Sequence, residues 1–569
     1  MSFYEKASLI LPVSPAYKDG ALQSYKPFTS EGTFTFLRGS NLSATRINKA
    51  GLVEKGRENL FLYSNQFSNS AWSKVNSSVA GGKSGYDESN DAWLLTSSSA
   101  GGRLQLNRSE DGINTTSAYF KKGSADGVWL RVDLQNTDAS VYVNLINGSK
   151  INSSGEIATR IADAGNGWYR VELVADWISV NNVRISPINT SGVVVAGSIF
   201  IQDAQLEKGL VATDVIETTN AAKTAGILED LPRLDYSGGA TCPSLLLEGA
   251  RTNIVAQSEY FGSGYWSKNA PLSIVDNYDQ SPEGAGNGSR WVSSGGSYPQ
   301  LGRTFTGLTI GEKYTASFYV KSDGTTQIQH KSWFTGFAGV DFTPTSEWQR
   351  INFSITASAT THNFIIFNNN NNAPSSSFLL WGAQIEAGSY PTSYMPTYGA
   401  TATRAKEAAS LVGTNLLDQD NQTLFIEYTK GGIDSNANTI YATSDGTSGA
   451  NRMQIVDNDD DVHLYSTASG NNILNNINAT LLTNLEKGDT IKVAVAMTAS
   501  SIKAFANGVQ KLNFTNSFSW SVTMDDLYIG ARGGSTETSK GQGVKQALVF
   551  KTALTDAELA TLTTLNNVQ

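Results

Sequence analysis

Two stretches of the sequence, RENLFLYSNQFSNSAWSK at residues 57–74 and RTNIVAQSEYFGSGYWSK at residues 251–268, match each other without a gap. Both keep an arginine, an asparagine, a serine, a phenylalanine and a closing Trp-Ser-Lys in the same places. A match of this kind between two distant parts of one chain is typical of an internal duplication. The sequence therefore predicts two copies of one folding unit.

Further matching blocks follow each copy in the same order. The matched pairs are Trp93 with Trp291, residues 117–121 with 317–321, residues 168–170 with 348–350, and residues 204–209 with 383–388. We define module 1 as residues 57–217 and module 2 as residues 251–400. Module 1 has extra residues between its second and third matched block. They predict an added hairpin near residues 141–162, because alternating runs flank an Asn147-Gly148 turn.

Apolar and polar residues alternate within the modules, for example in WLRVDL at 129–134 and YRVELV at 169–174. A period of two places the apolar side chains on one face of a strand. The chain has 53 glycines, and 40% of its residues are hydrophobic but only 16% charged. This composition favours short strands joined by many turns over a helical protein. We expect an all-β fold in which two antiparallel jelly-roll sandwiches lie in tandem.

The remaining parts of the chain follow other patterns. Residues 401–569 contain strand-like runs around an Asn507-Gly508 hairpin, and a Thr555–Glu558 capping box predicts one short C-terminal helix. Residues 218–250 are predicted to be a packed connector, because they are too apolar for a solvated linker. Residues 1–56 contain three prolines and little periodicity. We expect them to form an arm that orders on a partner and whose removal leaves the other domains folded.

Charge and composition argue against several classes of protein. The formal net charge is −9, with 42 basic and 51 acidic side chains and no long basic run, so nucleic-acid binding is not expected. Apolar runs fall short of the roughly 18 residues that span a bilayer, so membrane insertion is not expected either.

One cysteine and three histidines do not favour a disulfide framework or a His/Cys metal site. Cys242 is expected to be an inert, buried thiol. The first residues do not resemble a secretory signal, which indicates synthesis and folding in the cytoplasm of a host cell.

Catalytic motifs give little support to an enzyme. The sequence has no G-x-S-x-G elbow, H-E-x-x-H, P-loop or dinucleotide fingerprint. Two carboxylates that cleave a glycoside need only meet in space, so a pair among 51 acids cannot be recognised from sequence. We predict that the protein is not an enzyme.

Several residues are candidates for ligand contact. Tryptophans shared by both modules are interpreted as core, whereas unshared ones are better placed to stack on sugars. The unshared tryptophans are Trp129, Trp177, Trp333 and Trp381. Asn369 and Asn370, in an asparagine run after NFIIF, could hydrogen-bond to sugar hydroxyls, and Arg532 opens a glycine-rich turn. The alternative interpretation is that the tryptophans are core and that the asparagines form a polar loop tip.

An acidic cluster lies between two strand-like runs of the C-terminal domain. It comprises Asp457, Asp459, Asp460 and Asp461. Calcium prefers several carboxylate and carbonyl oxygens, so this cluster would suit a calcium ion. A solvated hairpin turn is the alternative, and the spacing lacks the glycine and distal glutamate of a helix-flanked calcium loop. No other cofactor is expected.

The repeated motifs resemble those of known virion proteins. The pattern RxN[LI]xxxSxxFxxxxWSK, the later AQ[LI]ExG and the PTSYMPT ending at Thr397 resemble bacteriophage virion modules related to jelly-roll carbohydrate-binding modules. The ANG hairpin, LYIG at 527–530 and the ALTDAEL ending resemble a concanavalin A-like, laminin-G-like lectin sandwich. The opening ASLILPVSPAYKDGALQSYKP and the later FTFLRGSNLSATR are similar to the start of tail-fibre proteins of marine and Bacteroidetes phages.

This resemblance implies a structural protein on the exterior of a phage particle. The expected role is a tail fibre or appendage that displays lectin-like domains for adhesion to host-surface glycans. A capsid decoration or head-fibre protein is the alternative, and a tailspike depolymerase is less favoured because no short β-helix repeat is present. Residues 1–56 would bind other virion proteins. Because single sugar contacts are weak, a homo-oligomer is expected, and a trimer is favoured by analogy with phage fibres.

Overall fold

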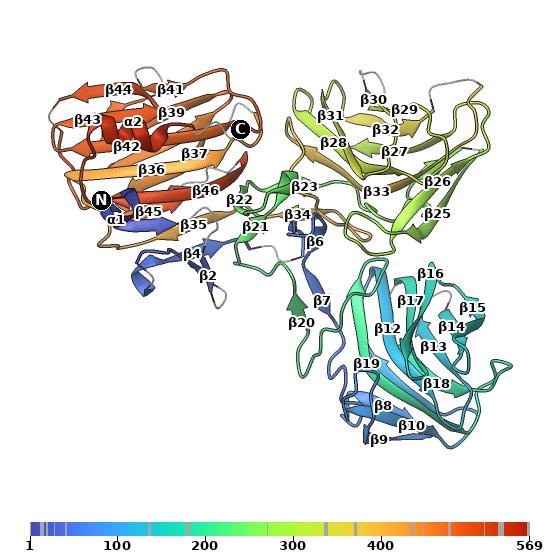
Figure 1. Cartoon of the computed structure of the whole chain (residues 1–569). Coiled ribbons are helices and arrows are strands. Elements are labelled where there is room, and N and C mark those ends of the chain that lie inside the picture. The colour runs from blue at the N-terminus through green and yellow to red at the C-terminus, as the bar shows by residue number, and fades with distance from the viewer. Residues whose placement is uncertain are drawn as a thin grey trace.

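The computed structural model is an all-β protein of three antiparallel β-sandwiches, which confirms the predicted fold class (Figure 1). The structure describes residues 2–11, 16–18, 21–27, 29–39, 42–134, 138–177, 182–269, 271–334, 339–368, 372–433, 437–447, 449–475, 479–516, 518–532 and 540–565. Two short α-helices, α1 (Phe3–Lys6) and α2 (Asp556–Thr563), and two 3-10 turns, η1 (Ser30–Gly32) and η2 (Ser237–Gly239), accompany the strands. The predicted capping box starts α2, because the Thr555 backbone N donates to Glu558 Oε2 at 2.9 Å. Neither helix has the length and hydropathy needed to cross a bilayer, within the described residues.

Module 1 is a sandwich of two six-stranded sheets. The first sheet has the order β16 (Ala158–Gly165), β17 (Trp168–Trp177), β12 (Gly112–Lys122), β19 (Gly197–Lys208), β10 (Ala92–Ser97) and β9 (Ser77–Lys83). The second has the order β15 (Ser149–Ser154), β14 (Ala139–Asn144), β13 (Gly127–Asp133), β18 (Asn182–Ile188), β11 (Arg103–Asn107) and β8 (Trp72–Val75). The alternating apolar side chains of both sheets meet in one core.

Module 2 has two five-stranded sheets with the same strand order. The first comprises β25 (Leu272–Asp279), β26 (Gly288–Ser293), β33 (Ser376–Ala387), β28 (Lys313–Ser322) and β31 (Gln349–Thr356). The second comprises β24 (Ser267–Lys268), β27 (Gln300–Thr306), β32 (Thr361–Phe367), β29 (His330–Phe334) and β30 (Val340–Phe342). Ser117 pairs with Gln205 and Ser317 with Gln384, and a bulge follows the serine in both modules.

The predicted Asn147-Gly148 turn joins β14 and β15 in an antiparallel hairpin. Strand β15 pairs with β14 and extends one sheet, whereas β16 pairs with β17 and extends the other sheet. Residues 149–165 therefore add one strand to each sheet. The prediction located the insertion and its turn, but not the pairing of β16 with the other sheet.

One of the matched tryptophan pairs is not structurally equivalent. Trp93 and Trp291 lie in corresponding strands, but Trp93 is opposite Ile201, whereas Trp291 is opposite Phe378. The bulge in each module aligns Ile201 with Leu380, so the two tryptophans stand two residues apart along the strand. Both positions lie on the same face, because side chains alternate with a period of two.

The C-terminal sandwich is built from several distant segments. One sheet has the order β21 (Arg233–Asp235), β22 (Ser244–Glu248), β46 (Lys540–Phe550), β36 (Asn421–Thr429), β42 (Thr490–Thr498), β43 (Ser501–Ala506) and β44 (Val509–Thr515), with β1 (Leu9–Leu11) also paired to β46. The other has the order β2 (Ala16–Lys18), β3 (Ala21–Gln23), β4 (Thr33–Leu37), β35 (Ala408–Leu411), β45 (Asp526–Ile529), β37 (Ala437–Ser444), β38 (Arg452–Asn458), β39 (Asp461–Ala468) and β40 (Asn471–Leu474), with β41 (Thr480–Leu482) paired to β39.

Residues 1–56 are therefore not an independent arm. Their strands β1 and β4 lie in the C-terminal sandwich, beneath which the blue N-terminal ribbon runs in Figure 1. Five of their apolar side chains belong to its core, namely Leu9, Leu11, Leu22, Phe34 and Phe36. The segment lacks a core of its own, as the sequence indicates, but the C-terminal sandwich of the same chain supplies one.

Three short ladders connect the sandwiches. They are β5 (Thr45–Ile47) with β6 (Val53–Lys55), β7 (Arg57–Asn59) with β20 (Lys223–Ala225), and β23 (Arg251–Asn253) with β34 (Ala402–Arg404). The region predicted as a packed connector supplies β20, β21 and β22. Its strands thus join module 1 to the C-terminal sandwich.

Candidate functional site

The motif residues shared by the modules hold the chain together within each module. Asn59 Nδ2 donates to Ile216 O at 2.8 Å, and Asn253 Nδ2 donates to Met395 O at 2.9 Å. The glutamate of each AQ[LI]ExG block accepts a backbone hydrogen bond at 2.8 Å, from residue 213 in module 1 and residue 392 in module 2. Because these groups are buried and hydrogen-bonded within each module, they explain why the motif recurs, and no ligand is needed to account for it.

Trp381, predicted as a sugar platform, is fully buried. The Lys55 ammonium lies over its ring at 5.2 Å and forms ion pairs with Glu259 at 2.6 Å and Glu283 at 2.7 Å. Tyr394 packs against the same indole, with ring centroids 4.5 Å apart. The prediction for Trp381 is wrong, because β6 from the N-terminal segment covers the position that an unaccompanied module would expose.

The other candidate tryptophans differ in exposure. Trp177 is fully buried and belongs to the module 1 core. Trp129 is half-buried and stacks on Tyr142, with ring centroids 5.4 Å apart. Trp333 is also half-buried, lies on the outward face of β29 and packs against Phe367 at 5.2 Å. Trp129 and Trp333 therefore stay candidates for ligand contact, whereas Trp177 does not.

The polar loop candidates are only partly described. Asn369 and Asn370 lie outside the described residues, as does the glycine-rich turn after Arg532. Arg532 itself is half-buried at the end of the strand region that contains β45. These three residues stay predictions.

The acidic cluster forms a turn around a lysine. Asp459 and Asp460 connect β38 to β39, and Asp459 has the left-handed φ of 54° that such a turn favours. Lys430 Nζ lies 2.6 Å from Asp457 Oδ1 and donates to Asp459 O at 2.9 Å. Asp461 lies 3.8 Å from His463. An ammonium group thus holds the buried carboxylate that was assigned to calcium, and the hairpin interpretation describes the geometry.

Asp457 is therefore corrected from a metal ligand to an ion-pair partner. Among the described residues, no group of three or more His, Cys, Asp or Glu side chains is placed to hold a metal ion. Calcium binding by Asp459, Asp460 and Asp461 stays a prediction.

A cleft with a volume of about 840 Å³ lies between module 2 and the C-terminal sandwich. We call it the interdomain cleft. Module 2 contributes Tyr319, Arg350 and Tyr390, and the C-terminal sandwich contributes Lys487 and Lys545. The volume is in the range of sites that hold drug-sized ligands or short oligosaccharides.

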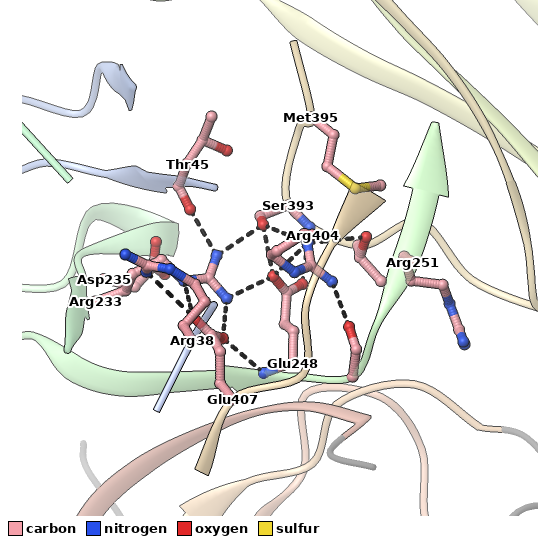
Figure 2. Close-up of polar contacts among 12 residues, drawn as sticks. Arg38, Thr45, Arg233, Asp235, Glu248, Arg251, Ser393, Met395, Arg404 and Glu407 are labelled. Atoms are coloured by element: carbon pink, nitrogen blue, oxygen red, sulfur yellow. Dashed lines mark hydrogen bonds and ion pairs between the residues drawn. The ribbon is translucent and has the colours of Figure 1, made fainter. Parts of the chain in front are cut away.

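Thr45, Glu248 and Ser393 form part of the floor of the interdomain cleft. They belong to a buried polar network, whose contacts Figure 2 shows. At its centre, Arg233 Nε donates to Glu407 Oε1 at 2.7 Å, and its Nη2 pairs with Glu248 Oε2 at 2.8 Å. Arg233 Nη1 donates to Thr45 O at 2.7 Å and to Ser393 Oγ at 2.8 Å. Three parts of the sequence, near residues 45, 233–248 and 393–407, therefore meet at one guanidinium.

Two more arginines join this network. Arg404 Nη1 lies 2.9 Å from Glu248 Oε2, and its Nη2 donates to Gly249 O at 2.9 Å. Arg38 Nη1 donates to Glu407 Oε1 at 3.3 Å. Three guanidinium groups thus share two carboxylates, and the side chains of all three arginines are fully buried. The network carries an excess of one positive charge beneath the cleft.

The pKa directions follow from this crowding. Burial alone would raise the pKa of Glu248, but Arg404 and Arg233 outweigh it and lower that pKa well below its usual range. Burial would lower the pKa of Arg233, but Glu407 and Glu248 raise it. For Arg38, burial dominates and lowers the pKa, because only Glu407 opposes it and the other arginines add to the effect. Arg38 is the least compensated cation of the network.

Cys242 is exposed and lines the same cleft, which corrects the prediction of a buried thiol. It lies in the loop between η2 and β22, whose apolar residues point into the C-terminal core while the loop faces out. The sequence gives no direct sign of the cleft, because the residues that line it come from segments between 45 and 545 that share no motif. The matched Trp-x-Arg block, which contains Arg350, was the one available signal.

Comparisons with known proteins give a fold likeness only. No protein-family model matches the chain, and no curated protein matches it. Among solved structures, the CBM40 module of the Ruminococcus gnavus IT-sialidase bound to α2,3-sialyllactose is 16% identical, with 26% of this chain and 84% of that chain covered and a TM-score of 0.23.

Two further solved structures are similar to the same extent. Domain 4 of AbnA, an extracellular arabinanase from Geobacillus stearothermophilus in complex with arabinotriose, is 14% identical, covering 28% of this chain and 77% of that one with a TM-score of 0.21. The binding domain of botulinum neurotoxin serotype D is 11% identical, covering 28% and 40% with a TM-score of 0.22. Each of these likenesses covers only about a quarter of this chain.

Proposed function

We propose that this chain is a non-catalytic structural protein on the exterior of a bacteriophage particle that binds host-surface glycans. The observation that carries the glycan part is the interdomain cleft, which is large enough for a short saccharide and combines aromatic, hydrogen-bonding and charged groups. A saccharide offers hydroxyls for the polar groups and apolar ring faces for the tyrosines. The virion part is supported by the resemblance of the repeat and of the opening segment to phage proteins.

Attachment to other virion proteins is assigned to the exposed face of residues 1–56. The segment packs into the C-terminal sandwich through its buried apolar side chains. Three of its large side chains are nevertheless exposed, namely Tyr4, Tyr25 and Leu37 at 52%, 70% and 56%. Large apolar side chains at a surface are frequent in protein contacts. A homo-oligomer, with a trimer favoured, would turn weak single-site binding into useful adhesion through a high effective concentration.

The first experiment uses the single cysteine as a reporter within the cleft. Cys242 is labelled with an environment-sensitive maleimide dye in the full chain, and the labelled protein is titrated with fragments of host-surface polysaccharide. Saturable fluorescence changes are expected, because the thiol lines the site. A dye attached to Thr447→Cys in a Cys242→Ser background should not respond, because Thr447 is not part of the cleft.

Two outcomes would overturn parts of this proposal. If no host glycan binds the full chain and labelled protein does not adhere to host cells, the adhesin is excluded and a capsid decoration protein is favoured. If the polysaccharide is shortened during incubation, the protein is a depolymerase. Gold labelling of purified particles then separates a tail location from a capsid location.

A further inference from the structure

Three cationic side chains face the interdomain cleft without an ion-pair partner. Arg350 comes from β31, Lys487 from the turn before β42, and Lys545 from β46. Within the described part of the chain, none has a carboxylate oxygen within 4.0 Å. The other two cations of the cleft wall are neutralised, Arg46 by Glu54 at 2.8 Å and Lys430 by Asp457 at 2.6 Å.

Lys487 and Arg350 lie close enough to repel each other. The pKa of Lys487 is lowered, first by partial burial and then by the positive charge of Arg350. Lys487 lies over the Tyr390 ring at 6.0 Å, and Arg350 lies over the Tyr319 ring at 5.5 Å. The ring faces compensate the cations only in part, because a cation–π contact is weaker than a charge pair.

The floor of the cleft adds to the positive field. The network of Arg38, Arg233 and Arg404 with Glu248 and Glu407 has one guanidinium more than it has carboxylates. Charges below a cleft with low-dielectric walls raise the local concentration of counter-ions. This local excess runs against the chain as a whole, whose formal charge is −9.

We propose that the interdomain cleft selects an anionic saccharide, whose carboxylate, sulfate or phosphate lies between Arg350, Lys487 and Lys545. This inference rests on the proposed glycan-binding function and names the chemical class of its ligand. Arg350 orients the ligand, because its Nη1 and Nη2 are fixed by Thr392 O at 2.7 Å and Ser317 Oγ at 2.9 Å. Lys487 is exposed at the mouth and Lys545 is half-buried in the wall, so both can reach the anion.

The test compares three short saccharides on the unlabelled full chain by isothermal titration calorimetry. The probes are trigalacturonate, a sulfated galactose trisaccharide and neutral maltotriose. Both anionic probes should bind at least tenfold more tightly than maltotriose, and the tighter one identifies the charged group. Raising the salt from 50 to 500 mM should weaken the anionic probes several-fold, because salt screens charge pairs in an open cleft.

Substitutions then assign the effect to the cleft. Lys487→Gln and Lys545→Gln should each weaken the anionic probe about fivefold and leave maltotriose unchanged. Lys487→Arg keeps the charge and should retain binding. Lys511→Gln, on the distant edge strand β44 of the same sheet, removes an exposed lysine and should change nothing.

The possible failures are distinguishable. Equal affinity for neutral and anionic probes, or no change in Lys487→Gln and Lys545→Gln, would overturn the anionic inference and leave glycan binding in place. Absence of binding by all three probes and by host polysaccharide fragments would overturn both the inference and the proposed function.

Discussion

Modules 1 and 2 share one strand order, yet they close the same surface by different means. The bulged ladders make Gln202 of module 1 equivalent to Trp381 of module 2, because Gln202 pairs with Tyr119 and Trp381 with Tyr319. In module 1, a local loop covers this position. Gln202 Nε2 donates to Asp91 Oδ1 at 2.7 Å, and Tyr86 from the same loop stacks on Tyr119 at 3.6 Å.

In module 2, a remote segment covers the equivalent position. Lys55, more than 300 residues away in sequence from Trp381, lies over the indole and bridges Glu259 and Glu283. One copy of the duplicated fold is thus self-contained, whereas the other uses the same surface to bind a neighbouring segment. The comparison shows that duplication can convert an outer surface into a joint without changing the strand order.

The largest effect expected from this difference is the loss of residues 1–56. Removing them takes β1 and β4 out of the C-terminal sandwich together with five core side chains. A buried large apolar residue contributes about 2–5 kcal/mol, so five contribute about 10–25 kcal/mol, as much as or more than the roughly 5–15 kcal/mol typical of a whole domain. The C-terminal sandwich should therefore unfold in the truncated chain, whereas module 1 should stay folded.

Hydrogen exchange read by mass spectrometry resolves the two regions. Peptides of β36 and β46 should lose their protection in the truncated chain, and peptides of β12 and β19 should keep it. The full chain is the control. Native protection of β36 after truncation would show that the N-terminal strands are dispensable. It would support the prediction that residues 1–56 form an independent arm.

A smaller but still large effect is expected for Lys55→Met. This change keeps the apolar stem but removes the only ammonium ion-paired with the buried Glu259 within the described residues, whereas Glu283 keeps its ion pair with Arg57 at 2.8 Å. Breaking a buried ion pair by removing one partner costs about 3–5 kcal/mol, because an uncompensated charge stays buried. Module 2 should be destabilised by this amount and module 1 should not.

Urea denaturation followed by hydrogen exchange of β28 and β12 gives the two stabilities separately. Lys122→Met is the matched control in module 1, because Lys122 pairs with Asp126 at the surface. An exposed pair is worth less than about 1 kcal/mol. Equal stability losses for the two variants would mean that the Lys55 cluster is not a structural joint.

The sequence was sufficient for the fold class because its signals are local. Alternation at 129–134 and 169–174, turn pairs and the capping box at Thr555 each act within a few residues, and the structure has strands and a helix there. Long-range pairing was not visible. Among the strands of residues 1–56, β4 alternates in TFTFL, but alternation alone does not identify the sheet that a strand joins.

The candidate site could not be predicted for the same reason. Trp381 is the residue type that most often stacks on sugars, and the sequence does not show that it is covered. Only the position of Lys55 in the structure shows this. Arg350, Lys487 and Lys545 become neighbours through the docking of two sandwiches, which leaves no spacing or motif in the sequence. The acidic cluster was recognised as a feature, but its partner Lys430 lies in another strand region and decides its role.

The smallest expected effect concerns a single core position that differs between the modules. Through the ladders of β13 and β29, Val128 of module 1 corresponds to His330 of module 2. His330 is buried among aromatic rings, at 4.7 Å from Phe378 and 5.7 Å from Phe342. Burial lowers the pKa of His330 to about 4, from an ordinary value of 6.5.

The direction of the pH effect follows from this shift. The unfolded chain binds a proton at His330 below about pH 6.5, whereas the folded chain does not until the pH approaches 4, so acid favours unfolding. Above pH 6.5 the effect is absent, and it grows as the pH falls to about 2 kcal/mol at pH 5. Module 2 should lose this stability between pH 6.5 and 5 in addition to any loss shared with module 1.

In His330→Val, which restores the residue of module 1, the additional loss should disappear even if the smaller side chain lowers stability at neutral pH. The measurement is the difference in unfolding free energy between pH 7 and pH 5 for each module, read from hydrogen exchange of β29 and β13. An unchanged difference for module 2 in the variant would assign its acid sensitivity to another group.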